Sequence, residues 1–259
     1  VPDPEPDLPW SGGKEEQGAF KNGRKHGYWT EWYPNEQIKS QGTYENGIMN
    51  GQWVFYYDNG AKEKEGTLVD GNADGQWVFY NNETRKLQEG TFNLGIKEGK
   101  WTAYFSDGSI TEGHYKNGKK DGKWIFYCKH EQKIEEGYYK DGEKHGKWIS
   151  YFEDGQIWYE ENYIDGKEHG EFIYFGNGNY NILHKLELNN YKDGILDGKT
   201  IYYHINGEKN SVINYKDGNK DGKNIFYDKD GKIYWSGTYK DGVLIDGDFI
   251  ESDKSFNLY

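Results

Sequence analysis

The sequence predicts an all-β protein, an elongated, single-layer array of about ten stacked antiparallel β-hairpin repeats of about 24 residues each. Three observations predict it. A pair of glycines four residues apart recurs along the chain, an aromatic-rich tetrad follows each pair, and turn-forming Asn-Gly or Asp-Gly steps come after many tetrads. A period in this range is typical of arrays in which each unit packs mainly on its neighbours.

The second glycine of each pair sets the register of the repeat. Successive second glycines are 24, 24, 24, 23, 24, 24, 28, 24 and 25 residues apart, and in nine copies an aromatic residue follows five positions later. This regularity predicts that the glycines are structural. They are Gly27, Gly51, Gly75, Gly99, Gly122, Gly146, Gly170, Gly198, Gly222 and Gly247.

The sequence of each copy predicts two strands and two turns that reverse the chain direction. In the fifth copy, residues 124–127 and 133–139 are rich in strand formers and are separated by a polar turn. Steps such as Asn59-Gly60 and Asp107-Gly108 predict the hairpin turns whose twist matches the strands. The residue before the second glycine is always polar and often Asn, Asp or His, which predicts a positive φ and a tight turn at that position.

An early glycine accompanies a tryptophan in six copies. Where a glycine stands five residues before the glycine pair, as Gly42 and Gly66 do, a Trp follows the second glycine by two positions. Copies seven to nine lose both residues together. We therefore expect each indole to cover the bare backbone of its glycine. The tryptophans are Trp29, Trp53, Trp77, Trp101, Trp124 and Trp148.

These patterns divide the chain into five segments. Residues 1–17 form a Pro-rich acidic linker, 18–175 the regular Trp-containing copies one to seven, 176–188 a longer hairpin insertion, 189–251 the degenerate copies eight to ten, and 252–259 a tail. The Pro-rich start is typical of an extended tether. It favours an exported or lipid-anchored protein, with a cytoplasmic location as the alternative.

The composition of the chain restricts the classes of partner that it can bind. The net charge of −12 argues against nucleic acid and anionic lipid, and no apolar run is long enough to span a membrane. The mean hydropathy of −1.12 alone would suggest disorder, but 18% aromatic residues in strict register argue for an ordered, thin sheet. The single cysteine, Cys128, excludes an internal disulfide.

No set of residues predicts catalysis, a cofactor or a metal. His145 and His169 occupy equivalent positions two strands apart, which places their backbones about 10 Å from each other, long for a shared ion. Nucleophile and phosphate-binding motifs are absent. The sequence therefore predicts a protein that is not an enzyme, and the row of six tryptophans is the candidate binding element.

The repeat resembles MORN repeats, and most closely their bacterial variant. Residues 118–127 and 142–151 match its pattern of G-x-x-x-G-x-W-x-x-Y, and the resemblance covers residues 18–251. It implies stacked hairpins and a role in protein–protein interaction or scaffolding. Some bacterial relatives are called YwqK-family antitoxins, and the family has no catalytic residues to transfer.

Together these observations predict a non-enzymatic module that binds a protein partner. One alternative is a glycan or cell-wall binding module that uses the Trp and Tyr rings as stacking platforms. Another is a cytoplasmic antitoxin or immunity factor. Open strand edges also allow a homodimer through the sheet edge.

Overall fold

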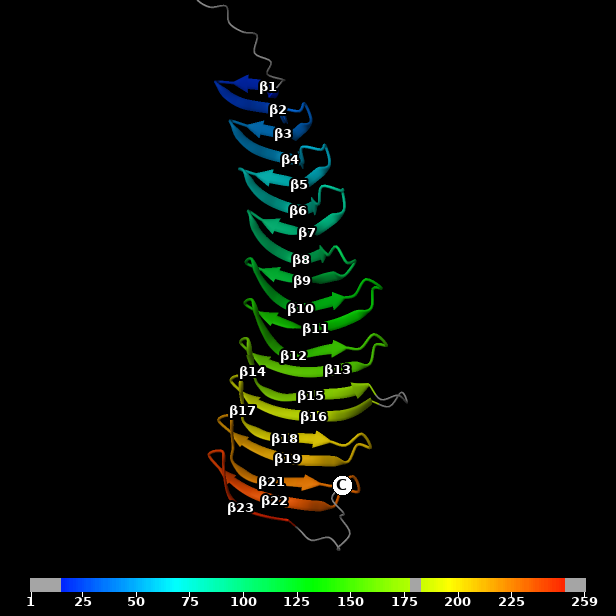
Figure 1. Cartoon of the computed structure of the whole chain (residues 1–259). Coiled ribbons are helices and arrows are strands. Elements are labelled where there is room, and N and C mark those ends of the chain that lie inside the picture. The colour runs from blue at the N-terminus through cyan, green and yellow to red at the C-terminus, as the bar shows by residue number, and fades with distance from the viewer. Residues whose placement is uncertain (1–14, 178–182, 250–259) are drawn as a thin grey trace, which may run out of the picture. The chain divides into compact units, whose positions relative to one another are not determined.

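The computed structural model describes residues 15–177 and 183–249, and these contain 23 β-strands, all paired antiparallel, and no helix (Figure 1). The chain divides into two compact units, residues 1–119 and 120–259. Within each unit the strands lie side by side in chain order, as Figure 1 shows. The predicted all-β fold of stacked hairpin repeats is thus confirmed.

The first unit is a run of nearly identical hairpins. Consecutive strands within this unit pair antiparallel. Its strands are β1 Glu16–Lys21, β2 Arg24–Trp32, β3 Ile38–Glu45, β4 Ile48–Tyr56, β5 Lys62–Val69, β6 Asn72–Tyr80, β7 Lys86–Asn93, β8 Ile96–Tyr104 and β9 Ile110–Lys116.

The second unit continues this pattern less regularly. Three strands after a tight turn are split in two, at His169, Asp197 and Asp221, so copies seven to nine show three strands where the sequence predicts two. The strands are β10 Lys119–Tyr127, β11 Lys133–Lys140, β12 Glu143–Tyr151, β13 Ile157–Ile164, β14 Lys167–Glu168, β15 Gly170–Asn177, β16 Leu183–Lys192, β17 Ile195–Leu196, β18 Gly198–Tyr203, β19 Lys209–Lys216, β20 Asn219–Lys220, β21 Gly222–Tyr227, β22 Ile233–Lys240 and β23 Val243–Phe249.

The predicted segment boundaries stay a prediction. Most of the predicted linker and tail, and residues 178–182 of the predicted insertion at 176–188, lie outside the described residues. The described part of the linker already joins the sheet, because the Trp32 N–H donates to the carbonyl of Glu15 and β1 begins at Glu16.

The tight turn lies four residues earlier in the repeat than the sequence predicts, at the first glycine of each pair and not at the second. Positive φ falls on the first glycine of each pair and on the residue before it, as at Asn46 (51°) and Gly47 (87°). Two successive residues with positive φ are what the type I′ hairpin turn requires. The residue before the second glycine, predicted to adopt positive φ, does not adopt it.

The positive φ predicted for that polar residue is therefore wrong, and its side chain has a different physical role. Where a copy has Asp or Glu there, the carboxylate accepts a hydrogen bond from the tight turn of the following copy. Glu98 accepts from the Asn117 N–H at 2.9 Å, and Asp74 accepts from the Leu94 N–H at 3.2 Å. It therefore links neighbouring copies instead of bending the chain.

The structural glycines do depart from ordinary backbone geometry, with one exception. Positive φ is found at Gly27, Gly51, Gly75, Gly99, Gly122, Gly146, Gly170, Gly198 and Gly222. The ladder in the adjoining hairpin loses register beside them, for example between Gly42 and Thr43. These glycines thus sit in β-bulges, where a left-handed residue is common. Gly247 is outside this set, because it pairs directly with Gly237.

The Asn-Gly and Asp-Gly steps form the other reversal, but with a longer turn than predicted. Gly60 has positive φ (82°) and Asn59 does not. The Tyr57 N–H donates to the carbonyl of Ala61, so the loop is wider than two residues. The Asn59 side chain accepts from the Ala61 N–H at 3.0 Å, which explains why Asn or Asp is favoured there.

The expected contact between tryptophan and glycine is confirmed. In five pairs the glycine and the tryptophan belong to the same unit. In all five, a Cβ on the glycine would lie 2.1–2.3 Å from the indole. The indole Nε1–H also donates to the carbonyl of the residue after the glycine, as Trp53 does to Thr43 at 3.1 Å. The pairs are Gly18–Trp29, Gly42–Trp53, Gly66–Trp77, Gly90–Trp101 and Gly137–Trp148.

Copies without this pair fill the position in other ways. In copy eight the Thr200 hydroxyl donates to the Asn189 amide oxygen at 2.9 Å. In copy nine the buried Asn224 accepts from the Asn214 N–H at 2.8 Å. In copy ten Gly237 is covered by Trp235 of its own strand together with Leu244 of the next strand. Short polar side chains thus replace the indole by hydrogen bonding.

The sheet of each unit has two chemically different sides. We call the side that carries the tryptophans the tryptophan face, and the opposite side the tyrosine face. On the tyrosine face, a Tyr hydroxyl of one strand donates to a Glu carboxylate, as Tyr80 does to Glu65 at 2.7 Å and Tyr151 to Glu136 at 2.8 Å. Burial, followed by this hydrogen bond, raises the pKa of Tyr80 and of Tyr151 to about 12.

We expect Gly66→Ala to destabilise the first unit by about 2–3 kcal/mol, because the added Cβ would lie 2.3 Å from the buried Trp77 ring. Chemical denaturation followed by circular dichroism measures the change. In a Trp77→Ala background the same substitution should cost much less. Equal costs in the two backgrounds would show that the indole is not the cause.

Leu94 is the one residue at the first position of a described tight turn that is neither Asn nor Asp, although its φ is 45°. A branched apolar residue is strained there, so Leu94→Asn should stabilise the protein by about 0.5–1 kcal/mol. The reverse change, Asn46→Leu, is the matched control and should destabilise by a similar amount. Thermal midpoints of both variants test this, and a lower midpoint for Leu94→Asn would contradict it.

The environment of Glu136 predicts that the free energy of unfolding depends on pH. Burial acts to raise its pKa, but hydrogen bonds from Lys123, Lys133 and Tyr151 outweigh burial and lower the pKa to about 2. The folded pKa lies below the unfolded value of about 4.3. The ionised Glu136 therefore stabilises the folded protein above pH 4.3, and this stabilisation is lost as the pH falls towards 2. Glu136→Gln should cost about 1–2 kcal/mol at pH 7 and almost nothing at pH 2. A cost that does not change between these pH values, measured by denaturation, would rule the explanation out.

Candidate interaction surface

The predicted row of tryptophans is buried. The exposed fractions of Trp29, Trp53, Trp77, Trp101, Trp124 and Trp148 lie between 1% and 4%. One ring face covers glycine in the pairs described above, and neighbouring side chains cover the rest. The six tryptophans therefore pack within the sheet. Their direct contact with a partner stays a prediction. A partner on this side would first meet the groups around the indoles.

Those groups form a continuous aromatic ladder on the tryptophan face of the first unit. Successive ring centroids are 5.0–6.4 Å apart. The three pairs from Trp53 to Phe79 are stacked, and the pairs on either side of them are edge-to-face; aromatic quadrupoles favour both arrangements. Several of the rings between the indoles are only half-buried. The ladder is Phe20, Trp29, Tyr44, Trp53, Phe55, Trp77, Phe79, Phe92, Trp101 and Tyr115.

Lysines cap this ladder at one repeat position, two residues before the second glycine. In the first unit the Lys25 Nζ lies 4.4 Å from the Trp29 ring centroid, and the Lys97 Nζ lies 3.8 Å from that of Trp101. In the second unit Lys120 and Lys144 lie 4.2 and 4.0 Å from the centroids of Trp124 and Trp148. An ammonium over an indole face is a favourable cation–π contact.

The capping lysines differ in their electrostatics. Burial lowers the pKa of Lys97 and of Lys120. Burial acts in the same direction on Lys25, but hydrogen bonds to Glu16 and Glu31 outweigh it and raise the pKa of Lys25. Lys97 instead donates to the Gln88 amide oxygen at 3.0 Å. The capped aromatic strip thus carries positive charge within a chain of net charge −12.

The capping position is occupied by Met49 and Ala73 in copies two and three, and the face is hollowed there. The dent has a volume of about 320 Å³. It is lined by aromatic and aliphatic side chains together with one lysine and one glycine. These residues are Phe55, Trp77, Phe79, Phe92, Met49, Leu68, Ala73, Lys64 and Gly71.

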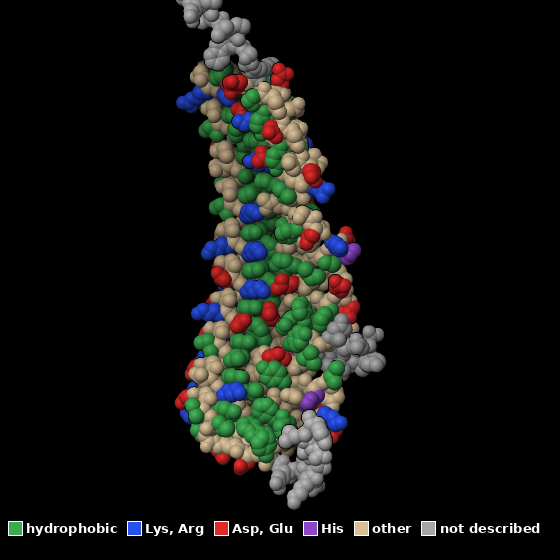
Figure 2. Space-filling view, viewed as in Figure 1, with side chains coloured by type: hydrophobic (Ala, Val, Ile, Leu, Met, Phe, Trp, Pro, Cys, Tyr) green, Lys and Arg blue, Asp and Glu red, His purple; other side chains and the backbone are tan. Residues whose placement is uncertain are grey.

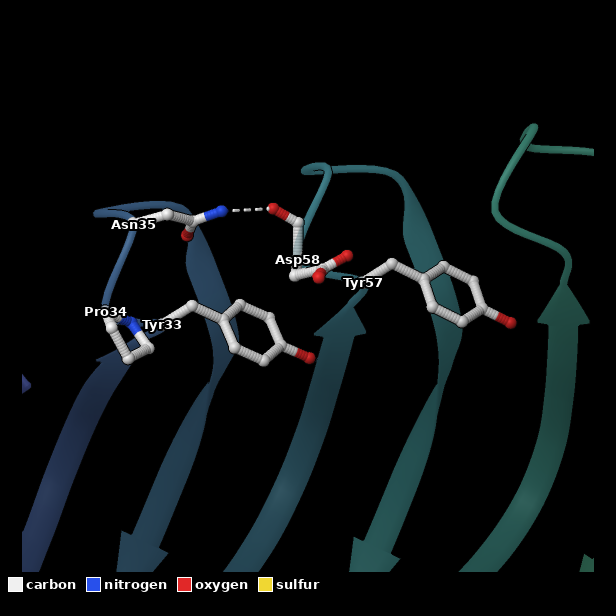
Figure 3. Close-up of a pocket in the computed structure, with 5 residues that line it drawn as sticks. All are labelled: Tyr33, Pro34, Asn35, Tyr57 and Asp58. Carbon is white, nitrogen blue, oxygen red and sulfur yellow. Dashed lines mark hydrogen bonds between the residues drawn. The ribbon is translucent and has the colours of Figure 1, made fainter.

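A second concavity lies at the hairpin ends of the first unit, and Figure 3 shows the residues that line it. Its volume is about 410 Å³, between Tyr33, Pro34 and Asn35 of one turn and Tyr57 and Asp58 of the next. The two Tyr rings point in the same direction, and the Asn35 amide donates to the Asp58 carbonyl at 2.7 Å.

The polar groups of this second concavity already have structural partners. The Tyr33 hydroxyl donates to the carbonyl of Tyr56 and the Tyr57 hydroxyl to that of Tyr80, both at 2.8 Å. These bonds connect one copy to the next. We therefore interpret the hairpin-end concavity as part of the repeat packing.

His145 and His169, which occupy equivalent repeat positions, each lie beside an aspartate of the following copy. The Nδ1 of His145 lies 3.4 Å from a carboxylate oxygen of Asp165, and that of His169 lies 3.6 Å from one of Asp193. Each histidine thus faces the turn of the following copy, as its Asp and Glu counterparts do. Within residues 15–177 and 183–249 no three potential ligands come together for a metal ion.

The lysine caps were not predicted from the sequence, although a signal was present. Four of the six copies with a tryptophan have Lys two residues before the second glycine. Only the strand geometry shows that these ammonium groups reach the rings. Figure 2 shows Lys and Arg side chains lying among the hydrophobic side chains along the strands.

Comparisons with known proteins agree with the repeat. The model of the family described as MORN repeat variant matches residues 25–46, 49–70, 97–117 and 144–165. No curated protein matches the chain. No helix among the described residues has the length and apolar character needed to cross a membrane.

Solved structures share only remote similarity. A crystal structure of TcdB2-TccC3-Cdc42 is 13% identical with a TM-score of 0.21, and the Photorhabdus luminescens Tc holotoxin pore is 12% identical with a TM-score of 0.21. Each alignment covers 83% of this chain, which spans 14% and 13% of those chains. A porin-like protein from Bacteroides uniformis is 8% identical with a TM-score of 0.20, over 82% of this chain and 90% of that one. These scores support no inference about function.

The family assignment therefore rests on the repeat and on the structure that it forms. The matched segments each run from the capping position to the next tight turn, for example residues 25–46. The YwqK-like subtype stays a prediction. With its paired glycines, its covered indoles and its stacked hairpins, the chain is a MORN repeat protein of the variant type.

Proposed function

We propose that this chain is a non-enzymatic interaction module that binds a protein partner across the tryptophan face of its first unit. MORN repeats are commonly protein or membrane interaction modules, and an all-β repeat fold of this kind is typical of non-catalytic proteins. The observation that carries the proposal is the half-buried aromatic ladder, which extends from Phe20 to Tyr115. Exposed aromatic strips with a polar margin are typical of protein interfaces.

The glycan alternative has less support. It depends on indole rings that a sugar could stack on, and the six tryptophans expose at most 4% of their surface. The antitoxin role, the export of the protein and a homodimer through the sheet edge stay predictions. The Pro-rich residues 1–14 that favour export lie outside the described residues.

Site-specific photo-cross-linking tests the proposal. A photoreactive phenylalanine analogue at Phe55 would lie on the tryptophan face, and the same analogue at the neighbouring Val54 would lie on the tyrosine face. In extract of the source organism we expect one protein to be cross-linked strongly from position 55 and weakly from position 54. Mass spectrometry identifies the product.

Two outcomes would contradict the proposal. Equal yields of one product from both positions would remove the assignment to the tryptophan face. Retention of the protein on cell-wall glycan, without any cross-linked protein, would favour the carbohydrate alternative.

A further inference from the structure

The dent in the first unit exists because copies two and three lack the lysine that caps copies one and four. At the equivalent position, Lys25 and Lys97 place an ammonium group over the nearby Trp ring, whereas Ala73 ends at its Cβ. Phe55 and Phe79, which line the dent, stand where copies one and four have Glu31 and Ala103. Trp77 stacks on Phe55 and on Phe79 at interplanar angles of 25° and 30°. The dent is thus a local departure from an otherwise capped surface.

The size and chemistry of the dent suit one large apolar side chain. Leu68 is 6% exposed and Trp77 3%, so the apolar base is well packed. The dent is open to solvent, and its volume of about 320 Å³ is small for a drug-sized ligand. A single leucine, methionine or phenylalanine inserted there would bury apolar area on both partners.

The charge around the dent indicates what lies next to that side chain in the partner. The residues that line the dent include one cation, Lys64, and no carboxylate. The Lys64 Nζ lies 4.9 Å from the Phe55 ring centroid and 3.7 Å from a carboxylate oxygen of Glu63. Lys97, paired with Phe92 at the side of the dent, adds a second cation. An acidic neighbour therefore complements this surface.

We propose that the dent receives one large aliphatic or aromatic side chain from a protein partner, with a nearby Asp or Glu of the same segment paired with Lys64. This inference rests on the proposed function and specifies its contact site. The partner segment would thus be apolar and acidic, although the chain that recognises it is itself strongly acidic.

A library of random 12-residue peptides displayed on phage, selected against the full chain, tests the proposal. We expect selected peptides to share a large apolar residue with Asp or Glu within three positions. Synthetic versions of these peptides are then titrated against variants. Ala73→Lys introduces the residue that the protein itself uses at the equivalent positions, and it should fill the dent and weaken binding about 10- to 100-fold.

Matched variants separate the two contributions. Asn72→Lys adds the same charge at the adjacent residue on the opposite face, and it should leave affinity unchanged within about twofold. Lys64→Gln should weaken binding about two- to fivefold, and less at high salt. Ala73→Leu fills the dent without a charge and replaces Ala73→Lys if that variant is less stable in a thermal melt.

Three results would overturn the inference. The first is that the selected peptides bind Ala73→Lys with the same affinity as the unmodified protein. The second is that the selected peptides are enriched in Lys or Arg. The third is that the selection enriches no peptide. A cross-link from position 55 that persists in Ala73→Lys would also contradict it, but would leave the proposed function standing. Loss of that cross-link in Ala73→Lys but not in Asn72→Lys would support both.

Discussion

The contact between an indole ring and a bare glycine backbone is the constraint on which the rest of the structure depends. In the pair Gly42–Trp53 the ring occupies the space where a Cβ would stand, and its N–H satisfies the carbonyl of Thr43 beside a bulge. A buried carbonyl left without a partner would destabilise the fold. One side chain thus covers the backbone, completes the hydrogen bonding and fixes the register of two strands.

With the indoles held in this way, the two sides of each unit take different roles. The tyrosine face is closed by hydrogen bonds and ion pairs, such as the group formed by Glu136, Tyr151 and Lys133. The tryptophan face keeps half-buried rings between the indoles. Lysines shield part of the aromatic row, as Lys25 does over Trp29 and Tyr44 and Lys97 over Trp101 and Tyr115. Binding capacity on this face therefore depends on where the shield is missing.

Departures from the repeat carry the information that distinguishes one copy from another. Thr200 and Asn224 replace the indole by hydrogen bonds, so they keep the fold without an aromatic ring. Met49 and Ala73 have no such compensation, and the surface is hollowed beside them. In a regular array an uncompensated change of this kind is where a partner can find a specific place to bind.

The sequence by itself determined the period, the strand-rich hairpins and the coupling of glycine to tryptophan, because each of these is a local pattern within one copy. The tertiary structure decided the rest. It showed that the tight turn falls at Asn46–Gly47 and that Glu98 binds the turn of the next copy. It also showed that the Trp row is buried, with lysines over four of its six rings. Those features depend on contacts between strands and between successive copies, and such contacts are fixed only when the strands pair in one register.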